Sequence, residues 1–206
     1  MKQEPRVNPV ISPISSDPLD AGEKEATVAG PAELVLRAEA PTSYSTRELK
    51  AFEKLILEGG EVSSQGLAER IRSAAVLIML SKHGMLIGIA ALKRPEPGYR
   101  VRVAEKSGVS VTAAGYPYEL GWVYVIPAES GSKHSYRLMD AAVVAGGVAG
   151  IFATTRTDNG AMHHILPRYG FLRVGAPYKS SRGNYCLTVF VRSARKTGGP
   201  LTEPNR

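Results

Sequence analysis

The middle of the chain alternates between short apolar runs, which are typical of strands, and stretches whose apolar residues follow helical spacing. The run at residues 32–39 predicts a first strand. Ser45 or Thr46 is placed to cap a following helix, whose apolar positions are Leu49, Phe52, Leu55 and Ile56. Residues 66–74 predict a second helix. The pattern therefore opens with a strand followed by two helices.

A hairpin is expected next, because residues 76–94 contain two apolar runs joined at residues 82–84. The segment from residue 95 to residue 117 has no clear period. It predicts at most a short helix or strand at residues 99–104, and we interpret the segment as a variable insertion.

The second half of the core predicts a buried strand, a helix, a strand, a helix and two further strands. In that order they cover residues 119–126, 136–147, 150–155, 159–169, 171–175 and 184–192. Pro127 ends the first of these strands. This order of elements predicts an α/β or α+β sheet with helices packed on it.

Composition sets the limits of this domain. Residues 1–31 are rich in proline and polar residues without apolar periodicity, and residues 193–206 have the same character. We expect a disordered leader (1–31), one domain (32–192) and a flexible tail (193–206). The leader has no apolar core of a signal peptide, which favours a cytoplasmic protein, and no apolar run is long enough to predict a membrane anchor. Cys186, the one cysteine, lies on a predicted buried strand, which favours packing over catalysis.

The chain carries 26 Lys and Arg against 19 Asp and Glu, a net charge of +7. An acidic partner is therefore plausible, whether a nucleic acid, an acidic protein or the phosphates of a nucleotide. The basic residues are scattered and follow no nucleic-acid-binding motif, which argues against nucleic acid. The four histidines lack the spacing of a metal site, so we expect no metal.

Four segments together resemble the GNAT superfamily of acyl-CoA-dependent N-acyltransferases. They are ELGWVYVIP (119–127), SGSKHSYRLM (130–139), ATTRTDNGAMHHILPRYGF (153–171) and NYCLTVFVR (184–192). The resemblance covers about residues 32–192. It implies a mixed, mostly antiparallel sheet of about six or seven strands, flanked by about four helices. It also implies acetyl-CoA as the co-substrate and an amine-bearing acceptor, and many relatives form homodimers.

The resemblance implies where acetyl-CoA binds. The backbone of Val123, Tyr124 and Val125 would pair with the pantetheine arm, and Asn159 would contact a pantetheine amide. The loop before the next helix would wrap the pyrophosphate; it comprises Ser130, Gly131, Ser132, Lys133, His134 and Ser135. Relatives usually have Arg or Gln where this chain has Ser130, and glycine where it has Lys133. Lys133 either adds a charge for the phosphates, obstructs them or is a solvated loop lysine.

The chemistry implied by the resemblance is direct acyl transfer to a primary amine. Such an amine has a pKa of about 10.4, so a base at the site helps to remove its proton. Glu119 matches the glutamate that serves many relatives, although a solvated glutamate would fit the sequence as well. Many relatives protonate the leaving thiolate with a tyrosine at the position of Leu166. Tyr169, His163 or His164 is a candidate substitute, and Tyr169 is the one we select.

We therefore predict an N-acetyltransferase that transfers acetyl from acetyl-CoA to a primary amine. The alternative is a catalytically degenerate protein of the same fold that binds acyl-CoA or a partner. Acceptor choice is expected to depend on the helices at residues 46–74 and on the loop at residues 176–183, because these regions vary freely in such folds.

Overall fold

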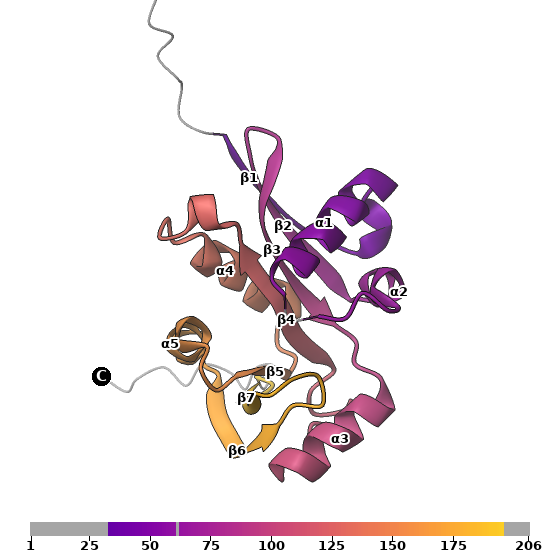
Figure 1. Cartoon of the computed structure of the whole chain (residues 1–206), viewed down its shortest axis with the longest axis vertical. Coiled ribbons are helices and arrows are strands. Elements are labelled where there is room, and N and C mark those ends of the chain that lie inside the picture. The colour runs from indigo at the N-terminus through magenta and orange to yellow at the C-terminus, as the bar shows by residue number, and fades with distance from the viewer. Residues whose placement is uncertain (1–32, 61, 196–206) are drawn as a thin grey trace, which may run out of the picture. The chain divides into compact units, whose positions relative to one another are not determined.

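The computed structural model describes residues 33–60 and 62–195 (Figure 1). The predicted leader and most of the predicted tail lie outside these residues. In chain order, the described part forms β1 (Leu34–Glu39), α1 (Thr46–Glu58), α2 (Leu67–Arg72), β2 (Val76–Lys82), β3 (Met85–Lys93), α3 (Pro97–Ser107), β4 (Tyr118–Val125), α4 (His134–Gly146), β5 (Ile151–Arg156), α5 (Gly160–Arg168), β6 (Leu172–Lys179) and β7 (Cys186–Arg192).

Within the described residues the strands form a seven-stranded sheet in the order β1-β2-β3-β4-β5-β7-β6. Only the β4–β5 pair is parallel, and the other neighbours are antiparallel. The predicted mixed, mostly antiparallel sheet is confirmed. Five α-helices flank it in the described part of the chain, against the expected four or so.

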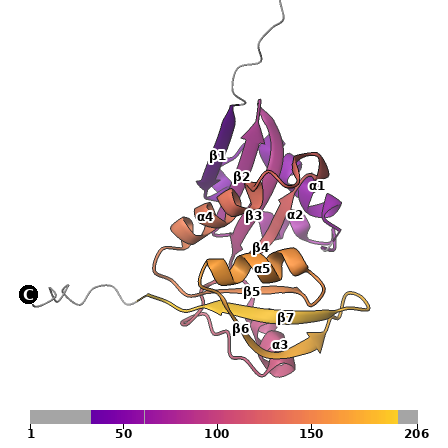
Figure 2. The ribbon, with the colours of Figure 1, turned by 90° about the vertical axis from the view of Figure 1, so that its left-hand side faces the viewer.

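The helices divide between the two faces of the sheet. Helices α4 and α5 cover one face, where Leu138, Met139, Ile165 and Leu166 join the largest buried cluster (Figure 2). On the other face α1 and α2 pack on β2 and β3, whereas α3 packs on β5 and β7. That second face therefore carries helices on each half of the sheet, with β4 between them.

Local sequence explains where the first elements begin and turn. Ser45 caps α1: its side chain accepts from the Glu48 amide at 3.3 Å, and the Glu48 carboxylate accepts from the Ser45 amide at 2.7 Å. The hairpin between β2 and β3 turns at His83 and Gly84, which both have positive φ angles of 50° and 75°. Both predictions are confirmed.

Two expectations differ in detail from the structure. Of the short helix or strand predicted at residues 99–104 the helix is present, and as α3 it is longer than predicted, because Val103 is buried against β5 and β7 and Arg100 donates to the Val111, Tyr116 and Pro117 carbonyls. Cys186 is exposed, since it only begins β7 and the buried part of that strand starts at Thr188.

Within the described ranges, no helix combines the length and the apolar character that crossing a membrane requires.

Candidate active site

The parallel pair β4–β5 separates after three residues. Tyr118, Glu119 and Leu120 pair with Ile151, Phe152 and Ala153, and the rest of β4 has no partner in β5. A bulge in β4 lies opposite Ile89–Ala91 of β3, and within it Trp122 has a φ of +54°, which is rare for a large side chain. The divergence leaves one edge of β4 without a neighbouring strand.

Hydrogen bonding on the other edge of β4 shows which amides face this gap. The Ile126 amide donates to the Ile87 carbonyl at 2.9 Å, so Ile126 belongs to a hydrogen-bonded pair with β3. Antiparallel pairs alternate, and Val125 is paired opposite Gly88 in the same register. The amide and carbonyl of Val125 therefore point away from β3, toward the gap.

A cavity of about 540 Å³ opens at the divergence. It lies on the face that carries α1, α2 and α3, and its lining continues through the gap to Asn159, Met162 and Leu166 at α5. Its volume is within the range of small-molecule sites. The cavity thus connects both sides of the sheet at the divergence of β4 and β5.

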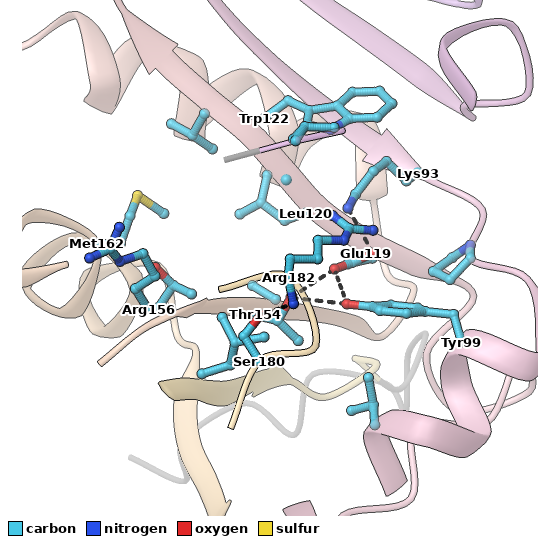
Figure 3. Close-up of a pocket in the computed structure, with 18 of the residues that line it drawn as sticks. Lys93, Tyr99, Glu119, Leu120, Trp122, Thr154, Arg156, Met162, Ser180 and Arg182 are labelled. Carbon is cyan, nitrogen blue, oxygen red and sulfur yellow. Dashed lines mark hydrogen bonds and ion pairs between the residues drawn. The ribbon is translucent and has the colours of Figure 1, made fainter. Parts of the chain in front are cut away.

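Glu119 lies on the floor of this cavity, with 4% of its surface exposed (Figure 3). Its Oε1 accepts from the Tyr99 hydroxyl at 2.9 Å and from the Thr154 hydroxyl at 3.0 Å, and its Oε2 lies 2.8 Å from Lys93 Nζ. An ionised carboxylate has about four acceptor positions. The described contacts occupy three of them, which leaves one for a ligand or a water.

Lys93 reaches Glu119 because Gly121 has no side chain. The two residues lie on neighbouring strands, Lys93 directly opposite Glu119. A Cβ on Gly121 would lie 2.6 Å from Lys93 Cε and 2.8 Å from Nζ. The Lys93 ammonium also lies 5.4 Å from the centre of the Trp122 ring, within range of a cation–π contact.

Tyr99 is the one residue that α3 contributes to the bonds around Glu119 among the described residues. Burial raises the pKa of the Tyr99 hydroxyl well above its usual value, and the nearby Glu119 carboxylate raises it further. Tyr99 therefore remains a hydrogen-bond donor to Glu119 at any physiological pH.

Asn159 lies at the far end of the cavity and starts α5. Its side-chain oxygen accepts from the Met162 amide at 3.1 Å, so it caps the helix. Leu166, at the position where relatives carry a tyrosine, lines the cavity with its side chain buried. Pro167 sits in the last turn, and α5 ends one residue later at Arg168.

The loop at residues 130–135 lies at the N-terminus of α4 and is not part of the cavity lining. Lys133 is the N-cap residue of α4 and has a φ of +59°. Its side chain makes no capping hydrogen bond to the helix. The family pattern places glycine at this position, and the backbone here adopts the left-handed conformation that glycine favours.

The side chains of Glu129, Lys82 and His134 fix the start of this loop. Glu129 lies 2.7 Å from Lys82 Nζ and 3.2 Å from the His134 Nε2, and the Lys82 hydrogen bond holds the pKa of Glu129 below its usual range. His134 is buried, and its Nδ1 has no hydrogen-bond partner among the described residues.

Of the residues selected from the sequence, Glu119, Val123, Tyr124 and Asn159 line one cavity. Tyr169 lies elsewhere. Its hydroxyl donates toward the Tyr136 carbonyl and the Asp140 carboxylate, both at 2.9 Å, and so joins α5 to α4 outside the cavity lining.

Three residues that touch Glu119 were missed by the sequence analysis, namely Lys93, Tyr99 and Thr154. Tyr99 was passed over because its segment showed no clear period, although Tyr99, Val103 and Ser107 follow helical spacing. Lys93 and Thr154 lie near the ends of two predicted apolar strands. The change from apolar to polar residues there was the signal that could have marked them as candidate site residues.

Solved structures share this fold. An acyl-CoA N-acyltransferase from Pseudomonas aeruginosa matches with a TM-score of 0.53 and 16% identity, over 78% of this chain and 99% of its own. The ribosomal-protein-S18-alanine N-acetyltransferase from Escherichia coli matches with a TM-score of 0.57 and 14% identity, over 81% of this chain and 99% of its own.

The chain has the GNAT fold. The protein yncA from Salmonella typhimurium, whose structure holds its cofactor acetyl-CoA, also matches, with a TM-score of 0.51 and 16% identity over 82% of this chain and 98% of its own. No protein-family model and no curated protein matches the sequence. The open edge of β4 and the loop at the N-terminus of α4 are the segments at which the sequence resemblance predicts the co-substrate, and this assignment stays a prediction.

Proposed function

We propose that the protein is an N-acetyltransferase that moves the acetyl group of acetyl-CoA to a primary amine. The observation that carries the proposal is the position of Glu119: a buried carboxylate on the floor of a cavity that opens onto the unpaired edge of β4. The GNAT fold and the acetyl-CoA held by one matched structure support the same conclusion.

Acetyl-CoA would bind along the gap between β4 and β5. The free amide and carbonyl of Val125 would pair with its pantetheine arm, as an added strand pairs with a sheet edge. Asn159 would contact it from α5, and the loop at Ser130–Ser135 would hold the pyrophosphate against the uncapped amides of α4. Lys133, exposed at that loop, would add a positive charge.

Glu119 would act as the base. The amine nitrogen forms a bond to the thioester carbonyl carbon, the carbon–sulfur bond breaks, CoA leaves as the thiolate, and the amine proton passes to Glu119 directly or through one water. The remaining acceptor position on its carboxylate is where that amine or water would bind. Tyr99, Thr154 and Lys93 are positioning residues that fix the carboxylate.

A backbone amide on β4 near Val125 would stabilise the negative charge on the carbonyl oxygen during transfer. The bulge at Trp122 supports this role, because it sets the register in which the Val125 amide points toward the gap, at the cost of an unfavourable φ. Tyr169 is left out of the proposed chemistry, since its hydroxyl is bonded to α4 outside the cavity.

A second candidate function is binding of acyl-CoA without turnover. It is supported by Leu166, which lines the cavity where many relatives have the tyrosine that protonates the thiolate, and by the non-glycine Lys133 in the loop. A CoA thiolate is a good leaving group without a strong acid, so these features do not outweigh the Glu119 site.

The test is a calorimetric titration of acetyl-CoA into the full chain, followed by thiol release in the presence of a panel of primary amines. Binding together with amine-dependent thiol release supports the transferase. Binding without release from any amine supports the second candidate, and no binding at millimolar acetyl-CoA overturns both.

A further inference from the structure

The cavity that contains Glu119 is strongly cationic. Among the described residues, seven Lys or Arg and two Glu line it. Lys93 is paired with Glu119, and Arg156 lies 2.6 Å from Asp158. The other five cations have no ion pair in the described part of the chain; they are Arg70, Arg94, Arg102, Lys106 and Arg182. A binding site with this excess of positive charge favours an anionic ligand.

Arg70 is held in place at the cavity by backbone carbonyls. Its guanidinium donates to the carbonyls of Ser63 at 2.6 Å and Gln65 at 3.2 Å, which fix its geometry without neutralising its charge. Burial lowers the pKa of Arg70 and the charge of Arg182 lowers it further, whereas the Glu96 carboxylate raises it. Arg70 comes from α2 and Arg182 from the connection between β6 and β7, and both line the same cavity, so an anion bound there would meet guanidinium donors from both.

Arg182 comes from the connection between β6 and β7. Its amide donates to Ser180 Oγ at 3.0 Å, which fixes the turn at its backbone. Its side chain extends from this turn over the cavity, toward the side where Glu119 lies (Figure 3). Within residues 33–60 and 62–195, its guanidinium has no hydrogen-bond or ion-pair partner. The five donors of this guanidinium thus have no acceptor among the described residues, and Arg182 lines the cavity.

The phosphates of acetyl-CoA are poor candidates for this anion. The loop proposed for them precedes α4, and α4 covers the opposite face of the sheet from α2, which carries Arg70. The anion that fits these arginines therefore belongs to the second substrate.

We propose that the acceptor is a small amine that carries a carboxylate or phosphate group. Arg70 and Arg182 bind the anionic group, and the amine is directed to Glu119. This assignment rests on the proposed transferase function. Guanidinium groups recognise both anions through paired hydrogen bonds, and the cavity volume of about 540 Å³ suits a small molecule beside the pantetheine arm.

The first experiment compares matched amines that differ in the anionic group. The pairs are O-phosphoethanolamine with ethanolamine, and β-alanine with β-alanine amide. For at least one pair, kcat/KM of the amine that carries the anionic group is expected to exceed that of the amine that lacks it by about tenfold or more. Arg182→Gln should raise KM for the charged amine about tenfold and leave KM for acetyl-CoA unchanged. The pair that shows the preference distinguishes phosphate from carboxylate.

Arg47→Gln is the matched control. Arg47 is exposed on α1, nine residues before the cavity residue Ile56 on the same helix. Its replacement by Gln removes the same charge as Arg182→Gln. Arg70→Gln is a second variant. Its melting temperature is measured as well, because Arg70 also bonds the backbone of residues 63–66 and its loss would affect stability.

A binding measurement separates this inference from the transferase proposal. Trp122 is the single tryptophan and lines the cavity, so its fluorescence reports occupancy without turnover. In the native chain and in Arg47→Gln, the amines with the anionic group should change the Trp122 fluorescence at about tenfold lower concentration than the amines without it. In Arg182→Gln this difference should disappear. This pattern without acetyl transfer would retain the anion site and overturn the transferase.

Three results would overturn the anion site instead. These are equal binding and equal rates for both members of each pair, an equal loss in Arg47→Gln and Arg182→Gln, or an increase in KM for acetyl-CoA rather than for the amine in Arg182→Gln.

Discussion

The floor of the cavity and the loop before α4 are built in opposite ways. On the floor, Glu119 is buried and bonded to Lys93, Tyr99 and Thr154, which come from three different elements. The loop at residues 130–135 is mostly exposed and takes its shape from local backbone geometry, with positive φ angles at Gly131 and Lys133. A change on the floor should therefore affect chemistry strongly, and a change in the loop should affect co-substrate affinity modestly.

The largest effect is expected from Glu119→Gln. The amide cannot take the amine proton, so kcat should fall by about 100- to 1,000-fold, while the dissociation constant of acetyl-CoA changes by less than about threefold. Steady-state kinetics and calorimetry measure the two quantities. Retention of more than a tenth of the native kcat would show that the floor does not supply the base.

Gly121→Ala tests the floor without altering any of its charged groups. The new methyl would displace the end of Lys93, a flexible side chain, and so break its contact with Glu119. We expect kcat to fall about tenfold with an unchanged KM for acetyl-CoA. Gly160→Ala is the control, because a Cβ there would have no atom within 4 Å. An unchanged kcat in Gly121→Ala would remove Lys93 from the positioning of Glu119.

The loop is tested at Lys133 by two substitutions. Lys133→Glu should weaken acetyl-CoA binding about tenfold and Lys133→Gly about threefold, because both remove a positive charge near the phosphates. Lys133→Gly should also raise the free energy of unfolding by up to ~1 kcal/mol, since glycine adopts the positive φ without strain. Calorimetry and urea unfolding measure these effects.

The control for the loop is Lys50→Glu, at an exposed position of α1 on the other face of the sheet. Tighter binding of acetyl-CoA to Lys133→Gly would mean that the lysine obstructs the phosphates.

The smallest effect is expected in the pH dependence of stability. The raised pKa of Tyr99 means that the unfolded chain ionises this hydroxyl first, near pH 10, whereas the folded chain keeps it protonated. Its contribution to stability is thus complete below pH 10 and is lost as the pH rises further. Burial also raises the pKa of Tyr44 and of Tyr178, each to about 12, so these residues act in the same direction.

Urea unfolding at pH 8, 10 and 11.5 is the measurement. Tyr99→Phe should cost about 1 kcal/mol at pH 8, from the lost hydrogen bonds, and should lose less further stability than the native chain between pH 10 and 11.5. An identical decline in the two proteins would show that Tyr99 ionises as readily in the folded state as in the unfolded state.

Much of the fold could be predicted because it is encoded locally. Ser45 and Glu48 are three residues apart, as a capping box requires, and His83–Gly84 separates two apolar runs, as a hairpin requires. Helix α3 was predicted only as a possible short helix or strand, because its stability comes from Val103 packing on distant strands and from Arg100 bonding distant carbonyls. Cys186 was wrongly expected to be buried, because periodicity does not show which end of a strand lies beyond the elements that cover it.

The sequence by itself determined the order of most strands and helices and the end of β4 before Pro127, because these depend on apolar spacing, helix caps and turn residues. Glu119 and Asn159 as site residues come from the resemblance in sequence motifs and stay predictions. Only the tertiary structure decided what surrounds Glu119. Lys93 and Tyr99 lie 26 and 20 residues before it, Thr154 lies 35 residues after it, and Arg70 and Arg182 come from opposite ends of the domain. No local pattern links such residues, since the sheet's strand order and register bring them together.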